Sequence, residues 1–593
     1  MSLEPPNDVT IQRLFDSPGE VSPGSFEIAL VLGGTVSSGS YTAGVLDFLV
    51  EALDSWNKGR AGGAVPNHTV IVRFLTGTSG GGVNAAIFTR AMNYDFRPVS
   101  QATPTEIAAQ NPFYDVWVNR LNLADMLTTT DLDRPGSTIT SLLNSDPVDA
   151  AAGASVAFTG VPLGTPRSWL ATPLRLFLTL TNLDGMPYRI DFGSMTLPDG
   201  STVNLQQSYV AHADFARFAV VYSGQSLAPT EERPDEFVLG FENPALPTSM
   251  GWDVFGQYAL GTAAFPIGLK PRVLSRPLAH YQYRLNDESA PLPPVAQGAT
   301  PHYFPLIPDW DAIQTWSGSG LPDPYTFTVV DGGVCNNEPI ELARTALAGI
   351  TGQNPRDGLV ANRAVLLVDP FAGSSVMPKP LAPDVLTSAG ALLSSVLQQI
   401  RYDTRDLLLA ANQDVFSRFM ISAQRGSSVG DYALATAGLN AFLGFASPAF
   451  RRHDYLLGRK NCQDYLRRFF VLPRNNPLFD GWRDESFAKN YQVTDSSNAV
   501  FLPIIPLIGN PNVEEVLDPW PSGAFNPDTL KPALEHRFTR LLSAEFAKGP
   551  LSDVLTWLAG KVAEGSTADY VIGLLKQALQ EWKLDAPGIV GGT

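Results

Sequence analysis

Residues 70–91 read VIVRFLTGTSGGGVNAAIFTRA, and this stretch decides the expected fold. The six residues from Val70 to Leu75 are mostly apolar, which is typical of a strand buried in a parallel sheet. A glycine-rich turn follows over 77–82, and from Val83 onward apolar residues recur at helical spacing. The stretch therefore predicts a strand, a tight turn and a helix, which is the repeating unit of α/β proteins.

The same unit occurs earlier in the chain. Residues 27–32 form a short apolar run, Gly33 and Gly34 end it, and helical spacing begins at Tyr41. Further strands are expected at 174–180, 326–330 and 364–368. Strands that alternate with helices predict an α/β fold with a mainly parallel sheet covered on both faces.

Changes in composition divide the chain into three expected regions. They are a flexible N-terminal tail (1–25), a main domain (26–375) with loop-rich insertions at 101–170 and 193–255, and a mainly helical C-terminal region (376–593). The helical expectation for the last region rests on amphipathic or helical patterns at 384–412, 535–549 and 550–582.

The charge balance and the cysteine count exclude several functions. The chain of 593 residues has a net charge of −17, which would repel a phosphate backbone, so we expect no nucleic-acid partner. Two cysteines and six scattered histidines form no metal-binding pattern, and we expect neither a metal nor a cofactor. The polar N-terminus has no signal sequence, and the longest uncharged run, 432–450, contains Gly, Asn, Ser and Pro. We therefore expect a cytoplasmic protein without a transmembrane helix.

The turn after the second strand carries the first chemical motif. Gly77, Ser79 and Gly81 form G-x-S-x-G between a strand and a helix, where a sharp turn exposes the serine hydroxyl. The glycines at its two ends allow the turn to close. The helix N-terminus behind Ser79 offers free N–H groups to a developing oxyanion. We interpret Ser79 as a nucleophile, and a purely structural turn is the alternative.

Two further turns follow apolar strands. Gly33 and Gly34 lack the spacing of a phosphate-binding loop, and the alternatives here are an oxyanion-binding loop or a plain turn between strand and helix. Asp331 ends an apolar strand and precedes Gly332 and Gly333. A desolvated carboxylate at this place could accept the serine proton without a histidine, and an Asx turn is the alternative.

Together these three segments resemble the patatin-like phospholipase family, a group of serine lipid acyl hydrolases. Three weaker similarities support the resemblance. They are LTLTNLDG at 178–185, GTAAFP at 261–266 and DGGVCNNEPI at 331–340. The order and the spacing of the six segments fit over about residues 26–375.

The resemblance implies a patatin-like three-layer sandwich and a catalytic Ser–Asp dyad, with Ser79 as the nucleophile and Asp331 as the base. It also implies an oxyanion hole formed by Gly33, Gly34, Thr35 and Gly80. The implied substrate is a phospholipid or a related acyl ester, with peripheral membrane contact left open, and the implied reaction needs no cofactor.

The first loop departs from the family pattern of three glycines, a variable residue, a basic residue and a glycine. The corresponding residues 34–39 read GTVSSG, so two glycines are replaced and the basic residue is missing. A positive φ at Thr35 or Val36 would be costly, especially for a β-branched residue, and Gly33 and Gly34 could supply the turn instead.

Other readings of the sequence stay open. A catalytically weak lipid-binding protein with this fold is one alternative, because the glycine loop is altered. A histidine-dependent esterase using His453 or His536 is another, because both histidines follow Asp331 in the chain. The apolar segments 439–450 and 500–508 could line an acyl channel or contact a bilayer, and core packing is the simpler interpretation.

Overall fold

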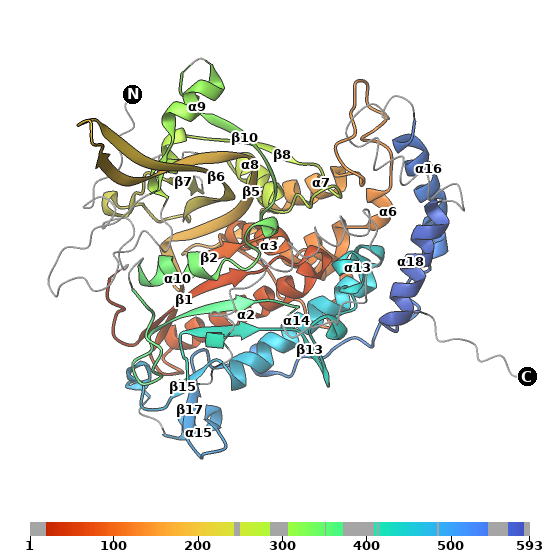
Figure 1. Cartoon of the computed structure of the whole chain (residues 1–593). Coiled ribbons are helices and arrows are strands. Elements are labelled where there is room, and N and C mark those ends of the chain that lie inside the picture. Colours follow the sequence, from red (N-terminus) through yellow and green to blue (C-terminus); the bar gives the residue numbers. More distant parts are fainter. Residues whose placement is uncertain are drawn as a thin grey trace, which may run out of the picture.

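The chain is an α/β protein built on one large twisted sheet (Figure 1). The structure is a computed structural model that describes residues 19–241, 250–284, 306–318, 320–349, 352–371, 408–410, 412, 414–482, 485–543 and 567–585. The main strand order is β12-β11-β1-β2-β5-β10-β8. These strands are β1 (Ser25–Leu32), β2 (Thr69–Gly77), β5 (Leu170–Thr196), β8 (Arg272–Arg276), β10 (Tyr325–Asp331), β11 (Arg363–Val368) and β12 (Arg418–Ile421). The five strands from β12 to β5 are parallel, whereas β10 and β8 are antiparallel to their neighbours.

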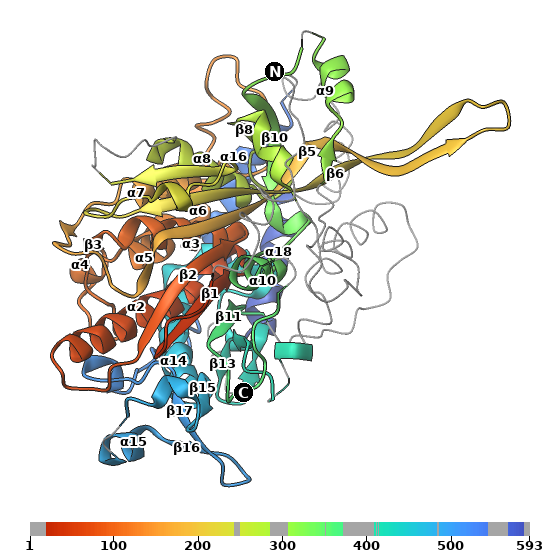
Figure 2. The same ribbon diagram turned by 90° about the vertical axis from the view of Figure 1, so that its left-hand side faces the viewer.

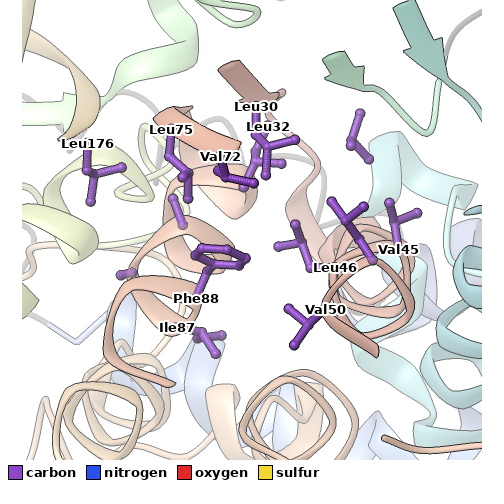
Figure 3. Packing of buried hydrophobic residues seen from close by; sticks show 14 of the residues in the cluster. Leu30, Leu32, Val45, Leu46, Val50, Val72, Leu75, Ile87, Phe88 and Leu176 are labelled. Carbon is purple, nitrogen blue, oxygen red and sulfur yellow. The ribbon is translucent and has the colours of Figure 1, made fainter. Parts of the chain in front are cut away.

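Helices cover both faces of the sheet. Successive side chains of a strand point to opposite faces, so a strand of apolar residues presents an apolar surface on each face that must be covered. On one face, Leu30 and Leu32 of β1 belong to the core formed with α2 (Gly39–Ala61) and α3 (Ser79–Ala91). Figure 3 shows these leucines beside residues of both helices. On the other face, Val31 packs with α10 (Ile340–Ala348). The result is a three-layer arrangement, as the sequence predicts.

The C-terminal part of the chain adds strands and helices to this core. Strand β12 extends the main sheet, and β15 (Val471–Pro473), β16 (Val493–Thr494) and β17 (Val500–Pro503) form a small second sheet. The long helix α14 (Pro448–Arg468) lies along α2, and α16 (Lys531–Leu541) packs against α18 (Thr567–Glu581). Each helix in the described part of the chain is too short or too polar to cross a lipid bilayer.

Several sequence predictions concern residues that lie outside the described ranges. They are the tail over 1–18, most of the amphipathic helix expected at 384–412, and residues 544–566 of the two last helical patterns.

The insertion 193–255 is not loop-rich, which corrects the sequence-based expectation. Its main element is β6 (Thr202–Val221), which pairs antiparallel with β5 to form a long ribbon that projects from the body (Figure 2). Strand β7 (Glu236–Gly240) then pairs with β6. The outer half of the ribbon has two exposed faces, yet Val203, Leu205, Tyr209 and Ala211 fall on alternate positions of β6, so the sequence carries a strand signal here.

The insertion 101–170 contains short helices between longer irregular segments. A short helix, α5 (Pro112–Tyr114), leads into a π-helical turn, η2 (Asp115–Arg120), and α7 (Asp146–Val156) follows. The Asn111 side chain caps α5 by accepting hydrogen bonds from two backbone N–H groups. The Asn-Pro signal and the apolar residues after it could have indicated this helix from sequence.

Candidate active site

The register of the sheet brings Ser79 and Asp331 to the same level. Strands β2 and β10 flank β5, and Gly77 at the end of β2 pairs with Leu178. Asp331 at the end of β10 pairs with Leu180, two residues further along β5. Ser79 lies two residues beyond Gly77, so the nucleophile and the carboxylate face each other across β5.

The turn that carries Ser79 is strained and closely packed. Ser79 has φ 53°, a left-handed conformation that a non-glycine residue rarely adopts, and its backbone N–H donates to Thr262 Oγ1 at 3.0 Å. A Cβ on Gly81 would lie 2.2 Å from the Leu32 carbonyl oxygen, and one on Gly77 would lie 2.8 Å from a backbone carbon. Both glycines predicted for this turn are therefore needed for its close packing.

Ser79 and Asp331 form a direct hydrogen bond. The Ser79 hydroxyl donates to Asp331 Oδ2 at 2.6 Å, and the other carboxylate oxygen accepts from the Gly333 N–H at 2.8 Å. The two side chains are 7% and 4% exposed, so little water competes for these bonds. Burial raises the pKa of Asp331 to about 6, although the hydrogen bonds from Ser79 and Gly333 oppose the shift.

Two other segments singled out in the sequence also meet at this carboxylate. Thr181 from the segment 178–185 donates its hydroxyl to the Asp331 carbonyl at 2.8 Å. The Asp331 N–H donates to the carbonyl of Ala264, in the segment 261–266, at 2.9 Å. The backbone N–H and carbonyl groups of Asp331 are thus both held by hydrogen bonds.

The first glycine loop differs from its prediction. The Gly33 N–H donates to the Val368 carbonyl and the Gly34 N–H to the Asn337 carbonyl, each at 3.2 Å. Neither glycine has a positive φ; the left-handed residue of this loop is Val36, with φ 47°. Because their N–H groups are occupied, Gly33 and Gly34 are unsuited to be oxyanion donors, and this corrects that part of the prediction.

The candidate donors are instead the next residues and Gly80. Within the described part of the chain, the N–H groups of Thr35, Val36 and Gly80 have no hydrogen-bond partner. The Thr35 hydroxyl is also buried without a partner among the described residues. A Cβ on Gly80 would lie 2.3 Å from this oxygen, so the loop and the start of α3 are in close contact.

An apolar pocket lies beside the dyad. It is lined by Ser79 and Gly80 together with Val36, Val83, Val116, Trp117, Leu121, Met126, Leu143, Val148, Ala151, Ala152, Leu260, Ala263, Phe265, Leu269, Phe442 and Phe445. Among these described residues no lining side chain carries a charge. The pocket therefore suits an uncharged, apolar group placed next to the serine hydroxyl.

The sequence patterns did not single out most of the residues that line this pocket. Trp117 lies on the π-helical turn, and a Cβ on Gly39 would be only 2.1 Å from its ring. The apolar residues of 101–170 show helical spacing, which was the available signal. From the segment 439–450, Phe442 and Phe445 do line the pocket, whereas in the segment 500–508 strand β17 belongs to the second small sheet.

The dyad and the pocket wall contain no histidine among the described residues. His453 Nδ1 is hydrogen-bonded to Asp454 Oδ1 at 2.8 Å on α14, and His536 lies on α16. In the described ranges, no three His, Cys, Asp or Glu side chains are grouped so that they could hold a metal ion.

Comparison with known proteins gives a relative of substantial similarity. The chain is 31% identical over 552 residues to the uncharacterized protein y4iI of Sinorhizobium fredii (strain NBRC 101917 / NGR234). The match covers 84% of this chain and 72% of that protein. The chain belongs to the same family as y4iI. No family model matches the chain.

Proposed function

We propose that this protein is a serine hydrolase of the patatin-like type, which cleaves the acyl esters of a lipid. The observation that carries the proposal is the 2.6 Å hydrogen bond from the Ser79 hydroxyl to Asp331, on a strained turn beside an apolar pocket. A nucleophile, its base and a site for an acyl chain are the parts that this chemistry requires.

In the proposed acylation step, Asp331 Oδ2 accepts the Ser79 proton while Ser79 Oγ forms a bond to the ester carbonyl carbon. The carbonyl π electrons move to the oxygen, which the N–H groups of Gly80, Thr35 and Val36 are suited to stabilise. When the carbonyl re-forms, the bond to the leaving alcohol breaks, and this alcohol takes the proton from Asp331. The acyl group then stays on Ser79.

In the proposed deacylation step, Asp331 takes a proton from water, and the resulting hydroxide equivalent attacks the acyl carbon. Breaking of the Ser79–acyl bond returns the proton to Ser79 Oγ and releases the carboxylic acid. A pKa of about 6 suits this role, because the carboxylate is mostly ionised at pH 7 yet is a stronger base than an exposed aspartate.

The pocket supports a lipid substrate. Its uncharged wall would bury an acyl chain, which gains about 0.8 kcal/mol for each CH₂ group removed from water. A phospholipid places such a chain at an ester carbonyl and its charged head group outside the pocket. We therefore propose phospholipids and related acyl esters as the substrate class.

The test compares wild type with Ser79→Ala and Asp331→Asn on a short-chain p-nitrophenyl ester and on a fluorogenic phospholipid, with chelator present. We expect turnover of both substrates by wild type alone. A fluorophosphonate should label wild type, and peptide mapping should place the label on Ser79.

The controls separate the alternatives. His536→Ala should retain turnover, because His536 lies on α16 and does not contact the dyad. His453→Ala is not a neutral control, because the His453 ring is hydrogen-bonded to Asp454, but turnover that remains in it should still depend on Asp331. Complete loss of turnover in either histidine variant while Asp331→Asn stays active would favour the histidine-dependent esterase. A folded wild type that neither turns over substrate nor accepts the label would refute the proposal and favour a lipid-binding protein.

A further inference from the structure

The loop beside Ser79, residues 33–38, needs contacts with other segments of the chain to keep its conformation. Val36 is β-branched and has φ 47°, a conformation that costs free energy and persists only where neighbouring contacts impose it. The next two residues, Ser37 and Ser38, have fully buried side chains. Their hydroxyls therefore need partners inside the protein, and those partners identify what holds the loop.

Both hydroxyls bind one segment of the C-terminal region, residues 434–446, which we call the strap. Ser37 Oγ donates to the carbonyl of Ala441. Ser38 Oγ lies 2.7 Å from Thr436 Oγ1. A Cβ on Gly444 would lie 2.3 Å from Ser37 Oγ, so the strap also packs closely against the loop.

The direction of the Ser38–Thr436 bond follows from counting protons. The Thr436 hydroxyl donates its single hydrogen to Asp454 Oδ2 at 2.6 Å, so it can only accept from Ser38. Asp454 also accepts from the backbone N–H groups of Thr436 at 2.9 Å and Ala435 at 3.0 Å. A fully buried carboxylate on α14 thus orders the strap, and the strap orders the loop.

The strap also reaches the pocket. Leu439, Asn440 and Ala441 have φ of 55°, 53° and 66°, and such left-handed runs of non-glycine residues are rare. The next residue, Phe442, lines the pocket and packs edge-on against Phe265. The segment that holds the loop therefore also forms part of the pocket wall.

We infer that Thr436 and Asp454 are positioning residues, which hold Ser38 so that the N–H groups of Thr35 and Val36 face the carbonyl bound at Ser79. This inference rests on the proposed hydrolase function. It places a requirement for turnover in the C-terminal region, outside the stretch that resembles known hydrolases.

The test replaces Thr436 by valine, which has a similar shape but can neither donate to Asp454 nor accept from Ser38. With the p-nitrophenyl ester, kcat should fall by about ten- to hundred-fold, since oxyanion stabilisation is lost, while KM changes less than about twofold. Thr436→Ser should restore most of kcat. Ser38→Ala is a smaller change that removes the same hydrogen bond, and it should lower kcat in the same way. It serves as the test if Thr436→Val does not fold.

Thr89→Val is the matched control, because among the described residues its buried hydroxyl bonds to the Ala85 carbonyl within α3 and to no other group. It should leave kcat unchanged. The rate of fluorophosphonate labelling at Ser79 should fall in Thr436→Val together with kcat.

The experiment distinguishes failure of the positioning inference from failure of the proposed hydrolase function. If wild type is inactive and unlabelled, the hydrolase proposal fails. If wild type is active and folded Thr436→Val and Ser38→Ala match its kcat, the positioning inference is overturned. It is also overturned if Thr436→Ser fails to rescue, because the loss would then come from general destabilisation.

Discussion

The environment of Asp331 sets the proposed reaction's dependence on pH. Its carboxylate is buried, and burial raises its pKa from 3.8 to about 6 by penalising the charged form. The proposed mechanism needs this carboxylate ionised in order to accept the Ser79 proton. The same shift therefore affects both activity and stability.

We expect kcat/KM to fall tenfold for each pH unit below about pH 6, because protonated Asp331 cannot act as a base. Ester hydrolysis measured from pH 4.5 to pH 8 would show this limb. A rate that stays constant between pH 5 and pH 7 would contradict Asp331 as the base.

For stability, the folded protein binds the Asp331 proton more tightly than the unfolded chain does. The contribution that the Asp331 proton makes to the free energy of unfolding is therefore lost as the pH rises from about 4 to about 6. A pKa shift from 3.8 to about 6 corresponds to about 3 kcal/mol of this free energy. Asp331→Asn does not titrate, so it should be more stable than wild type above pH 6 by up to this amount. Urea unfolding at pH 4.5 and pH 7.5 measures the gap, which should widen with pH.

Substitution of Gly80 by alanine tests whether the loop beside Ser79 acts in catalysis. A Cβ there would lie 2.3 Å from Thr35 Oγ1 and 3.0 Å from the Val36 carbonyl, so Gly80→Ala should push the loop away and lower kcat about 10²- to 10³-fold. Gly153→Ala in α7 is the matched control, since nothing lies within 4 Å of its Cβ. Equal activity of the two variants in the ester assay would show that the loop does not act in catalysis.

At the scale of elements, α2 and α14 cross with their backbones in contact. A Cβ on Gly44 would lie 1.9 Å from the Tyr455 carbonyl oxygen, and one on Gly458 would lie 2.1 Å from the Tyr41 carbonyl oxygen. Each helix thus presents a glycine to the backbone of the other.

Gly44→Ala and Gly458→Ala should each destabilise the protein by about 1–3 kcal/mol or more, because the two helices must move apart. Gly573→Ala in α18 is the control: its Cβ meets nothing within 4 Å, so alanine should stabilise by up to about 1 kcal/mol. Thermal unfolding of the three variants compares these effects. Unchanged melting of both crossing variants would contradict the packing described.

The elements differ in how far their sequence could predict them. Strands β1 and β2 were predictable because a strand that is largely buried reads as a mostly apolar run. The outer part of β6 also carries a signal, because Val203, Leu205, Tyr209 and Ala211 fall on alternate positions although both faces are exposed. The conformation of Val36 was beyond prediction, since the hydrogen bond that secures its neighbour Ser37 joins residues 404 positions apart.

In the candidate site, too, the features that a local sequence pattern encodes could be predicted, and those that depend on distant residues could not. Ser79 and Asp331 could be proposed because each stands in a local pattern that carries its chemistry, a serine within G-x-S-x-G and an acid at a strand end. The occupied N–H groups of Gly33 and Gly34 depend on distant residues, Val368 and Asn337, and no local pattern encodes them.

At the scale of the whole molecule, the boundary expected near residue 375 does not separate independent parts of the structure. Strand β12 pairs with β11 in the main sheet, α14 lies along α2, and the strap contacts the loop beside Ser79. The C-terminal region therefore completes the core and the candidate site.

We expect the fragment 26–375 alone to be insoluble or to lack a cooperative unfolding transition, because it would expose the edge of β11 and the face of α2 that α14 covers. Coexpression with 376–593 should restore a soluble complex. Cooperative melting of 26–375 by itself, followed by circular dichroism, would contradict this expectation.

The projecting ribbon has a consequence for how the molecule opens. The part of β5 from Leu174 to Leu180 is buried in the sheet, whereas in the outer ribbon Ile190, Val203 and Leu205 are each at least 40% exposed. One continuous strand thus joins a buried part of the sheet, which is expected to open slowly, to a tip that is expected to open readily, because unzipping the tip breaks only the ribbon's own bonds. The ribbon tip is therefore a natural place for proteolytic nicking, and a peptide tag inserted near Gly200 would leave the sheet and the serine site undisturbed.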